Sequence, residues 1–166
     1  MLRVVLADDE KKVLLLMCKL IDWESLGFEI VGMASDGMHA LEMIRDKQPH
    51  LLVTDIRMPG FDGIDLIRQA KQMQPGLHFI VVSGYAQFEY AQNALKYGVE
   101  GYLLKPLKDG ELELVVRRIQ GQEEALESKA AKEQDMPVFR LNPVKNTKNK
   151  YVEQAVQLIR EHFRED

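Results

Sequence analysis

Polar side chains that could do chemistry come directly after apolar segments at several points in the chain. Asp8 and Asp9 follow "LRVVLA", and Asp55 follows "LLVT". Further along, Ser83 ends "HFIVVS" and Lys105 follows "GYLL". Short apolar runs of this kind are typical of buried strands, and Asp is among the residues that strands most avoid. The position of Asp55 therefore needs a chemical reason.

Three carboxylates gathered in one cleft repel one another: at ~4 Å and an effective dielectric of ~20, each pair costs roughly 4 kcal/mol. Such a cluster takes up protons unless cations compensate it. Mg²⁺ suits oxygen ligands, typically binds one or two carboxylates and accepts a phosphoryl oxygen. Lys105 supplies a second positive charge that can hold a phosphoryl oxygen. With both cations in place, Asp55 stays ionised and can attack phosphorus, which gives an aspartyl phosphate.

An alternation of strand and helix patterns must position these residues. Apolar runs predict five strands, and helical spacing predicts a helix after each one. Because the strands are apolar on both faces, we expect a parallel sheet covered by helices on both sides, a doubly wound α/β fold. The flavodoxin-like strand order 2-1-3-4-5 is one of the few topologies that short right-handed connections allow. Ligands then bind at the carboxyl ends of strands 1 and 3. The predicted strands are 2–7, 28–34, 50–55, 78–84 and 100–106.

Four motifs in this order, "ADDE", "LLVTDIRMPGFDG", "VVSGYA" and "GYLLKP", closely resemble the receiver domain of two-component response regulators over about residues 1–120. The resemblance implies an Mg²⁺ site formed by Asp9, Asp55 and the backbone carbonyl of Arg57. Asp8 would contribute through the waters of the metal. Asp55 would be the phospho-acceptor, and a sensor histidine kinase would be the phosphoryl donor.

The same resemblance implies how a phosphoryl group becomes a signal. Lys105 matches the conserved lysine of the family, and the "KP" motif implies a cis peptide bond before Pro106. Ser83, where the family often has Thr, would bind a phosphoryl oxygen. Tyr102 would turn inward and reshape the surface of the fourth helix, fifth strand and fifth helix. We expect this change to drive homodimerisation.

The segments "GYAQFEYAQNALKYGVEGYLLKPL" and "IDWESLGFEIVGMASDG" are similar to a subfamily whose output is an AraC-type helix-turn-helix module. In that subfamily a segment like "YVEQAVQLIREHFRED" forms the first helix of the DNA-binding module. The expected organisation is a receiver at 1–120, a helical extension and linker at 121–148, and an amphipathic helix at 149–166 that begins a truncated DNA-binding module. Either the chain is a fragment that binds DNA only through an output module missing from it, or its last segment has another use. We expect the fragment.

The segment after Ile119, "QGQEEALESKAAKEQD", is charged and rich in helix formers. Leu112, Ile119 and Leu126 stand at heptad intervals, so this segment could extend the last helix into a short dimer seam. A solvated helical tail is the alternative. The sequence does not decide between them.

Composition excludes several other classes of protein. The chain of 166 residues is 46% hydrophobic and 29% charged, and its net charge of -4 argues against binding nucleic acid by bulk electrostatics. No apolar run approaches the ~18 residues of a membrane helix and no signal peptide is evident, so we expect a cytoplasmic protein without membrane contact. Cys18 is the only cysteine, which excludes an internal disulfide. The four histidines lack metal spacing and are assigned to packing or solvent: His39, His50, His78 and His162.

Two other functions compete with a transcriptional switch. A phosphorelay carrier would pass the phosphoryl group onward without DNA output, but it would need neither the linker nor the last amphipathic helix. A phosphatase of the haloacid-dehalogenase kind would need an acid two residues after its nucleophile, and that position holds Arg57. No Gly-rich phosphate loop of either common type occurs either. We therefore expect a regulatory protein and not an enzyme.

Overall fold

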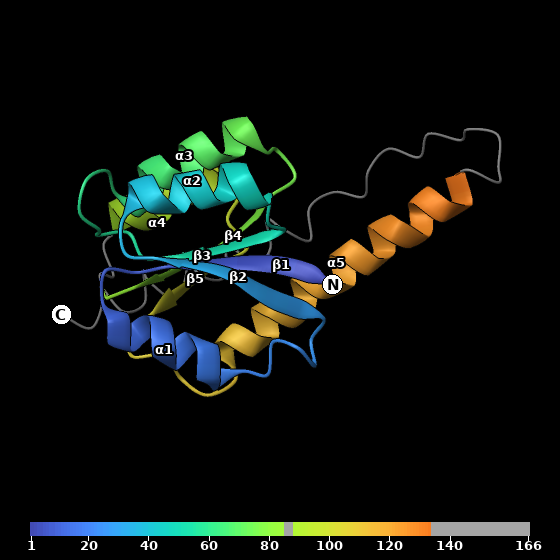
Figure 1. Ribbon diagram of the computed structural model, residues 1–166, viewed down its shortest axis with the longest axis horizontal. Coiled ribbons are helices and arrows are strands. Elements are labelled where there is room, and N and C mark those ends of the chain that lie inside the picture. Colours follow the sequence, from blue (N-terminus) through green and yellow to red (C-terminus); the bar gives the residue numbers. More distant parts are fainter. Residues whose placement is uncertain (85–87, 134–166) are drawn as a thin grey trace.

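Five parallel strands form a central sheet in the order β2-β1-β3-β4-β5 (Figure 1). The computed structural model describes residues 1–84 and 88–133. The strand order β2-β1-β3-β4-β5 confirms the predicted doubly wound α/β fold. The predicted segment 149–166 lies outside the described residues. The strands are β1 (Leu2–Ala7), β2 (Phe28–Ala34), β3 (Leu51–Thr54), β4 (His78–Ser83) and β5 (Gly101–Leu104).

Helices cover both faces of the sheet (Figure 1). Successive strand residues point to opposite faces, so Val5 and Ala7 pack beneath α2, α3 and α4, whereas Val4 and Leu6 pack against α1 and α5. The strands β1, β3 and β4 are therefore almost continuously apolar, as a strand buried on both faces must be. The helices are α1 (Lys11–Leu20), α2 (Gly37–Lys47), α3 (Gly63–Met73), α4 (Phe88–Lys96) and α5 (Glu111–Glu133).

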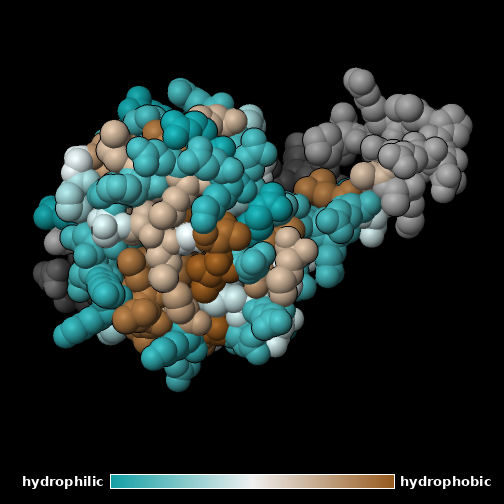
Figure 2. Space-filling view, viewed as in Figure 1, coloured by the Kyte–Doolittle hydropathy of each residue, from teal (hydrophilic) through white to brown (hydrophobic). Residues whose placement is uncertain are grey.

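The edge strand β2 departs from the expectation of strands buried on both faces. Glu29 and Met33 are exposed, and Figure 2 shows apolar side chains gathered over β2 and α1. An open strand edge invites pairing with another chain. Here the pairing of β2 with β1 is interrupted by a bulge at Val31, and the Lys47 ammonium donates to the Val31 carbonyl. Both features make this edge a poorer template for another strand.

Backbone hydrogen bonds continue the sheet by one residue beyond the carboxyl ends of the strands. The Asp8 N–H donates to the Ala34 carbonyl at 3.0 Å, and the Asp55 N–H donates to the Ala7 carbonyl at 2.9 Å. The Lys105 N–H donates to the Ser83 carbonyl at 2.9 Å. These bonds hold three residues that lie far apart in the sequence at the same end of the sheet.

The helix α5 is the longest element, and its second half projects away from the sheet (Figure 1). Its first half packs on the core through Leu112, Val116 and Ile119. Because the helix is continuous to Glu133, the expected domain boundary after residue 120 falls inside it. Among the described helices, none combines the length and the apolar character needed to cross a membrane.

Candidate functional site

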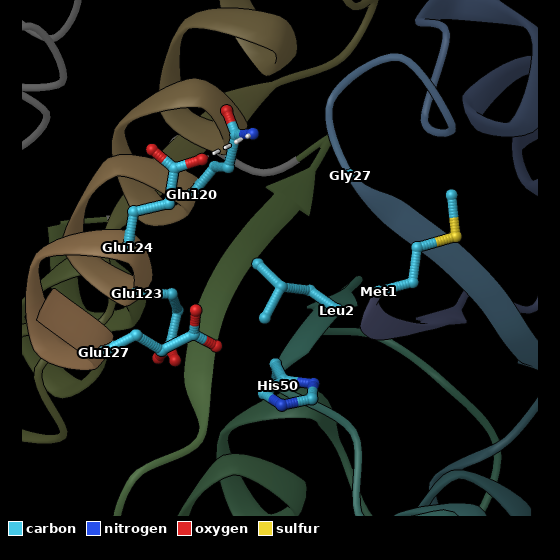
Figure 3. A pocket seen from close by; sticks show the side chains of 8 residues that line it. All are labelled: Met1, Leu2, Gly27, His50, Gln120, Glu123, Glu124 and Glu127. Carbon is cyan, nitrogen blue, oxygen red and sulfur yellow. Dashed lines mark hydrogen bonds between the residues drawn. The ribbon is translucent and has the colours of Figure 1, made fainter. Parts of the chain in front are cut away.

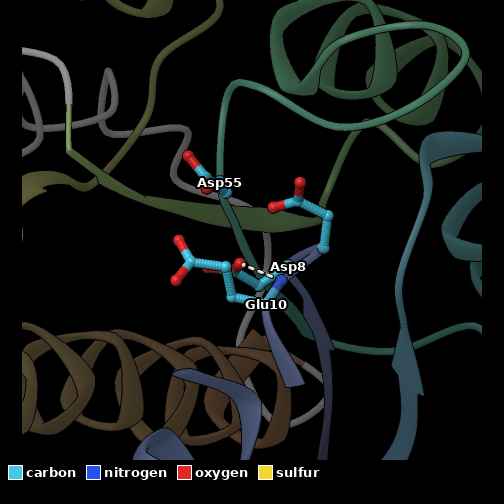
Figure 4. A group of neighbouring side chains, drawn as sticks. Asp8, Glu10 and Asp55 are labelled. Carbon is cyan, nitrogen blue, oxygen red and sulfur yellow. Dashed lines mark hydrogen bonds between the residues drawn. The ribbon is translucent and has the colours of Figure 1, made fainter. Parts of the chain in front are cut away.

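Four carboxylates meet at the carboxyl end of the sheet. Oxygens of Asp8, Asp9, Glu10 and Asp55 all lie within 4.8 Å of one another, and Figure 4 shows Asp8 and Glu10 beside Asp55 from the neighbouring strand. The structure thus brings together the three acids that the sequence singled out. Glu10 was missed, although it is the third acid of "ADDE" and stands directly after the predicted pair.

Lys105 lies among these acids and contacts three of them. Its Nζ is 2.8 Å from Asp8 Oδ2, 2.9 Å from Asp55 Oδ2 and 3.4 Å from Glu10 Oε1. Burial lowers the pKa of Lys105, but the contacts with Asp8 and Asp55 raise it by more, so the net shift is upward. The ammonium therefore stays charged and partly compensates the cluster.

Asp8 is fully buried, and its two carboxylate oxygens have different surroundings. Its Oδ1 accepts the Glu10 N–H at 2.8 Å. Its Oδ2 has the close Lys105 ammonium beside it, but no donor reaches it with hydrogen-bond geometry. Burial raises the pKa of Asp8, and the contacts with Lys105 and the Glu10 N–H oppose that rise. A buried carboxylate oxygen of this kind is costly unless a cation satisfies it.

A hard divalent cation fits this set of residues. The donors are all oxygens, four carboxylates face one ammonium, and Asp8 Oδ2 is buried without a hydrogen bond. Mg²⁺ prefers carboxylate, carbonyl and water oxygens. Arg57, whose backbone carbonyl the resemblance to receiver domains implies as a ligand, is exposed in the loop after β3. Its role stays a prediction.

The connection from β3 to α3 holds Asp55 still. The Thr54 hydroxyl donates to the Asp55 carbonyl at 2.8 Å, and the Ile56 N–H donates to Asp55 Oδ1 at 2.7 Å. Gly63, the first residue of α3, donates its N–H to the Ile56 carbonyl at 2.6 Å. A Cβ at Gly63 would lie only 2.0 Å from the Asp55 carbonyl oxygen. The absence of a side chain there lets α3 begin directly against the backbone of Asp55.

Ser83 and Tyr102 lie together beside the acids. Both are buried, Ser83 at the end of β4 and Tyr102 in β5, where it pairs with Val81. Burial raises the pKa of Tyr102 to about 12, while a hydrogen bond with Ser83 acts in the opposite direction. The ring of Tyr102 belongs to the apolar cluster beneath α2, α3 and α4. Next to this pair, the peptide bond between Lys105 and Pro106 is cis.

Comparison with known proteins identifies relatives of this arrangement. The family model described as response regulator receiver domain matches residues 4–117. The chain is 47% identical over 112 residues to the uncharacterized transcriptional regulatory protein YesN of Bacillus subtilis, covering 68% of this chain and 30% of the relative. It is 35% identical over 119 residues to the transcriptional regulatory protein HptR of Staphylococcus aureus, covering 72% of this chain and 46% of the relative. The chain thus spans less than half the length of these two relatives.

Solved structures support the same fold. The REC domain of AraT, a response regulator from Geobacillus stearothermophilus, is 36% identical with a TM-score of 0.72, and the match covers 76% of this chain and 98% of that one. A CheY-like receiver domain protein from Methanospirillum hungatei is 27% identical with a TM-score of 0.67, covering 75% of this chain and 98% of that one.

Proposed function

The chain belongs to the response regulator receiver family, and from this premise we propose that Asp55 accepts a phosphoryl group from the phosphohistidine of a sensor kinase. The observation that carries the proposal is the position of Asp55. Its carboxylate ends a rigid buried strand, lies 2.9 Å from the Lys105 ammonium and shares a cluster with three other acids. A carboxylate held in this way is a positioned nucleophile.

The transfer exchanges one bond to phosphorus for another. A carboxylate oxygen of Asp55 bonds to phosphorus while the bond to the kinase imidazole nitrogen breaks, and the imidazole leaves with the electron pair. Phosphoryl transfer depends mainly on positioning and on compensation of the negative charge. Lys105 supplies part of that compensation, because its ammonium lies close enough to Asp55 to contact an incoming phosphoryl oxygen as well.

The residues proposed to hold Mg²⁺ are Asp9, Asp55 and the carbonyl of Arg57, with Asp8 acting through water. Mg²⁺, when bound, neutralises charge on the acids and on the phosphoryl oxygens. The burial of Asp8, whose Oδ2 has no hydrogen-bond partner, supports this assignment. Glu10 adds negative charge at the exposed rim of the same cluster.

Ser83 and Tyr102 are proposed to convert the phosphoryl group into a change of surface. The Ser83 hydroxyl, which is bonded to Tyr102, would instead bind an oxygen of the phosphoryl group on Asp55. Tyr102 is already buried. When Ser83 binds the phosphoryl group, the Tyr102 hydroxyl loses its hydrogen bond to Ser83, and the position of the ring inside the domain changes. We expect the response on the face formed by α4, β5 and α5, where it would favour a homodimer.

Transcriptional output is the proposed end of the signal. Two relatives that match the receiver are named transcriptional regulatory proteins, and each extends well beyond the matched part. DNA binding would then reside in an output module of the AraC type. The alternative of a phosphorelay carrier has no comparable support.

Intact-mass measurement after treatment with acetyl phosphate and Mg²⁺ tests the proposal. We expect one added phosphoryl group on the wild type and none on Asp55→Asn. Asp46→Asn is the matched control, because Asp46 is exposed on α2 and pairs with Arg45, and it should label like the wild type. Equal labelling of the wild type and Asp55→Asn would refute the assignment.

A further inference from the structure

A buried histidine lies between two glutamates at the end of the sheet opposite the acidic cluster. His78 begins β4 and is 3% exposed, with Nδ1 2.7 Å from Glu100 Oε1 and Nε2 2.6 Å from Glu123 Oε1. The Glu100 side chain is 4% exposed and that of Glu123 is 18% exposed. Glu100 precedes β5, whereas Glu123 lies in the projecting half of α5. His78 thus links the sheet to that half of α5.

The two contacts of His78 require an additional proton. A neutral imidazole has one N–H and one acceptor nitrogen, so it can donate to only one of two ionised carboxylates. Its other nitrogen would face a carboxylate oxygen with no hydrogen between them. Both short contacts form only if the ring is doubly protonated or if one glutamate is protonated. In either case the three side chains share one acid proton.

Further charged groups lie around His50, which neighbours His78. From β1 and the chain start come the terminal amine and Arg3, whose backbone N–H donates to His50 Nδ1 at 2.9 Å. His50, which precedes β3, accepts the His78 backbone N–H on its carbonyl at 3.0 Å. Burial, followed by the charge of Arg3, lowers the pKa of His50, so His50 stays neutral where it accepts the Arg3 N–H. On α5, Arg118 lies in the turn before Glu123.

Glu123 has a path to water. It lines a cavity of about 220 Å³ between α5 and the start of β1 (Figure 3). Glu124 and Glu127 line the same cavity from α5, opposite Leu2 and His50. Protons can therefore reach the cluster through this cavity.

We propose that His78, Glu100 and Glu123 form a proton-dependent latch that fixes α5 to the sheet at Glu123, where the projecting half of the helix begins. When the shared proton is lost, one contact must break. Glu123 is the partner that leaves, because it is the more exposed of the two glutamates and borders the cavity. The latch therefore sets how firmly α5 is fixed to the sheet at Glu123.

Two measurements on the full chain test the latch over a series from about pH 6 to about pH 10. The ¹⁵N signals of the His78 ring, assigned by backbone-to-ring correlation, report the proton. Amide hydrogen exchange of residues 121–130, corrected for the intrinsic effect of pH, reports the attachment of α5. In the wild type we expect exchange to become about tenfold faster as the ring signals titrate, because a charge-assisted hydrogen bond is lost.

The matched pair of variants is Glu123→Gln and Glu124→Gln. Glutamine at position 123 can still hydrogen-bond a neutral imidazole, so the first variant should keep α5 attached and lose the pH dependence of exchange. Glu124→Gln removes a neighbouring charge in the same cavity and should retain that dependence. Exchange that is independent of pH in the wild type, or equally dependent on pH in Glu123→Gln, would overturn the proposal.

Discussion

Replacing Gly63 with alanine should disturb the candidate site more than its small size suggests. The new Cβ would lie 2.0 Å from the Asp55 carbonyl oxygen and 2.9 Å from both the Asp55 carbonyl carbon and the Ile56 Cα. All three neighbours are backbone atoms, so no side chain can rotate away. A carbon normally stays about 3.3 Å from a carbonyl oxygen. The start of α3 and the backbone at Asp55 must therefore separate by about 1.3 Å, which is the difference between this normal contact and the 2.0 Å that the new Cβ would have.

The expected cost follows from that displacement. Overpacking of a rigid site costs about 1–3 kcal/mol in the free energy of unfolding. A misplacement of about 1 Å at a reacting group reduces the reaction rate by about 100-fold. We expect a similar loss in the rate of Asp55 labelling, because the 2.9 Å contact between Lys105 and Asp55 depends on the same backbone. Urea unfolding followed by the fluorescence of Trp23, the only tryptophan, measures the stability. Intact mass against time with acetyl phosphate measures the labelling rate.

Gly76→Ala is the control for the Gly63→Ala experiment. A Cβ at Gly76 would have no neighbour within 4 Å, so its effect on stability should stay within about 0.5 kcal/mol and labelling should be unchanged. The reasoning would be refuted if Gly63→Ala unfolded at the same urea concentration as Gly76→Ala and labelled at the wild-type rate.

Three further predictions concern side chains at the site. Lys105→Met should reduce the labelling rate at least about tenfold, because the loss of one charge-assisted contact to the phosphoryl group has about this effect; an unchanged rate would exclude the proposed role of Lys105. Burial raises the pKa of Asp8, and the protonated acid disfavours a cation, so the increase in melting temperature that Mg²⁺ causes should be full near neutral pH and lost as the pH falls through that raised pKa. An Mg²⁺ effect of the same size at neutral and at acidic pH would contradict this. Ser83→Ala should still label at Asp55 but lose the change in amide exchange of β5 and α4 on labelling, whereas a wild-type response would show that Ser83 is not needed.

The sheet could be predicted from the sequence because its strands are short, apolar and regularly separated by helices. The strand order places Asp8, Asp55 and Lys105 at the ends of β1, β3 and β5, and no side-chain detail is needed to bring them to one end of a parallel sheet. The features of the edge strand β2 could not be predicted from the sequence. The exposed residues of β2 and the bulge at Val31 depend on the absence of a neighbouring strand, which local sequence does not encode.

Other features required the packed structure. Glu10 joins the cluster because the backbone turns after β1 and the Glu10 N–H donates to Asp8 Oδ1. His78 and Glu123 are 45 residues apart and meet only because α5 continues past the sheet. The sequence assigned His78 to packing or solvent, since its spacing to other histidines suggested no metal site. A partner such as Glu123, which lies on a helix far along the chain, produces no local sequence pattern around His78.

Chemical trapping of the phosphorylated residue tests the central claim most directly. Borohydride reduces an aspartyl phosphate to the alcohol of homoserine, whereas it leaves free carboxylates unchanged. Trypsin cleavage after Lys47 and Arg57 releases residues 48–57, in which Asp55 is the only acidic side chain. After acetyl phosphate and Mg²⁺, we predict homoserine at position 55 of this peptide, and none when Mg²⁺ is removed with EDTA. The account would be contradicted if every peptide still carried aspartate at position 55 and the phosphoryl group were found on another residue.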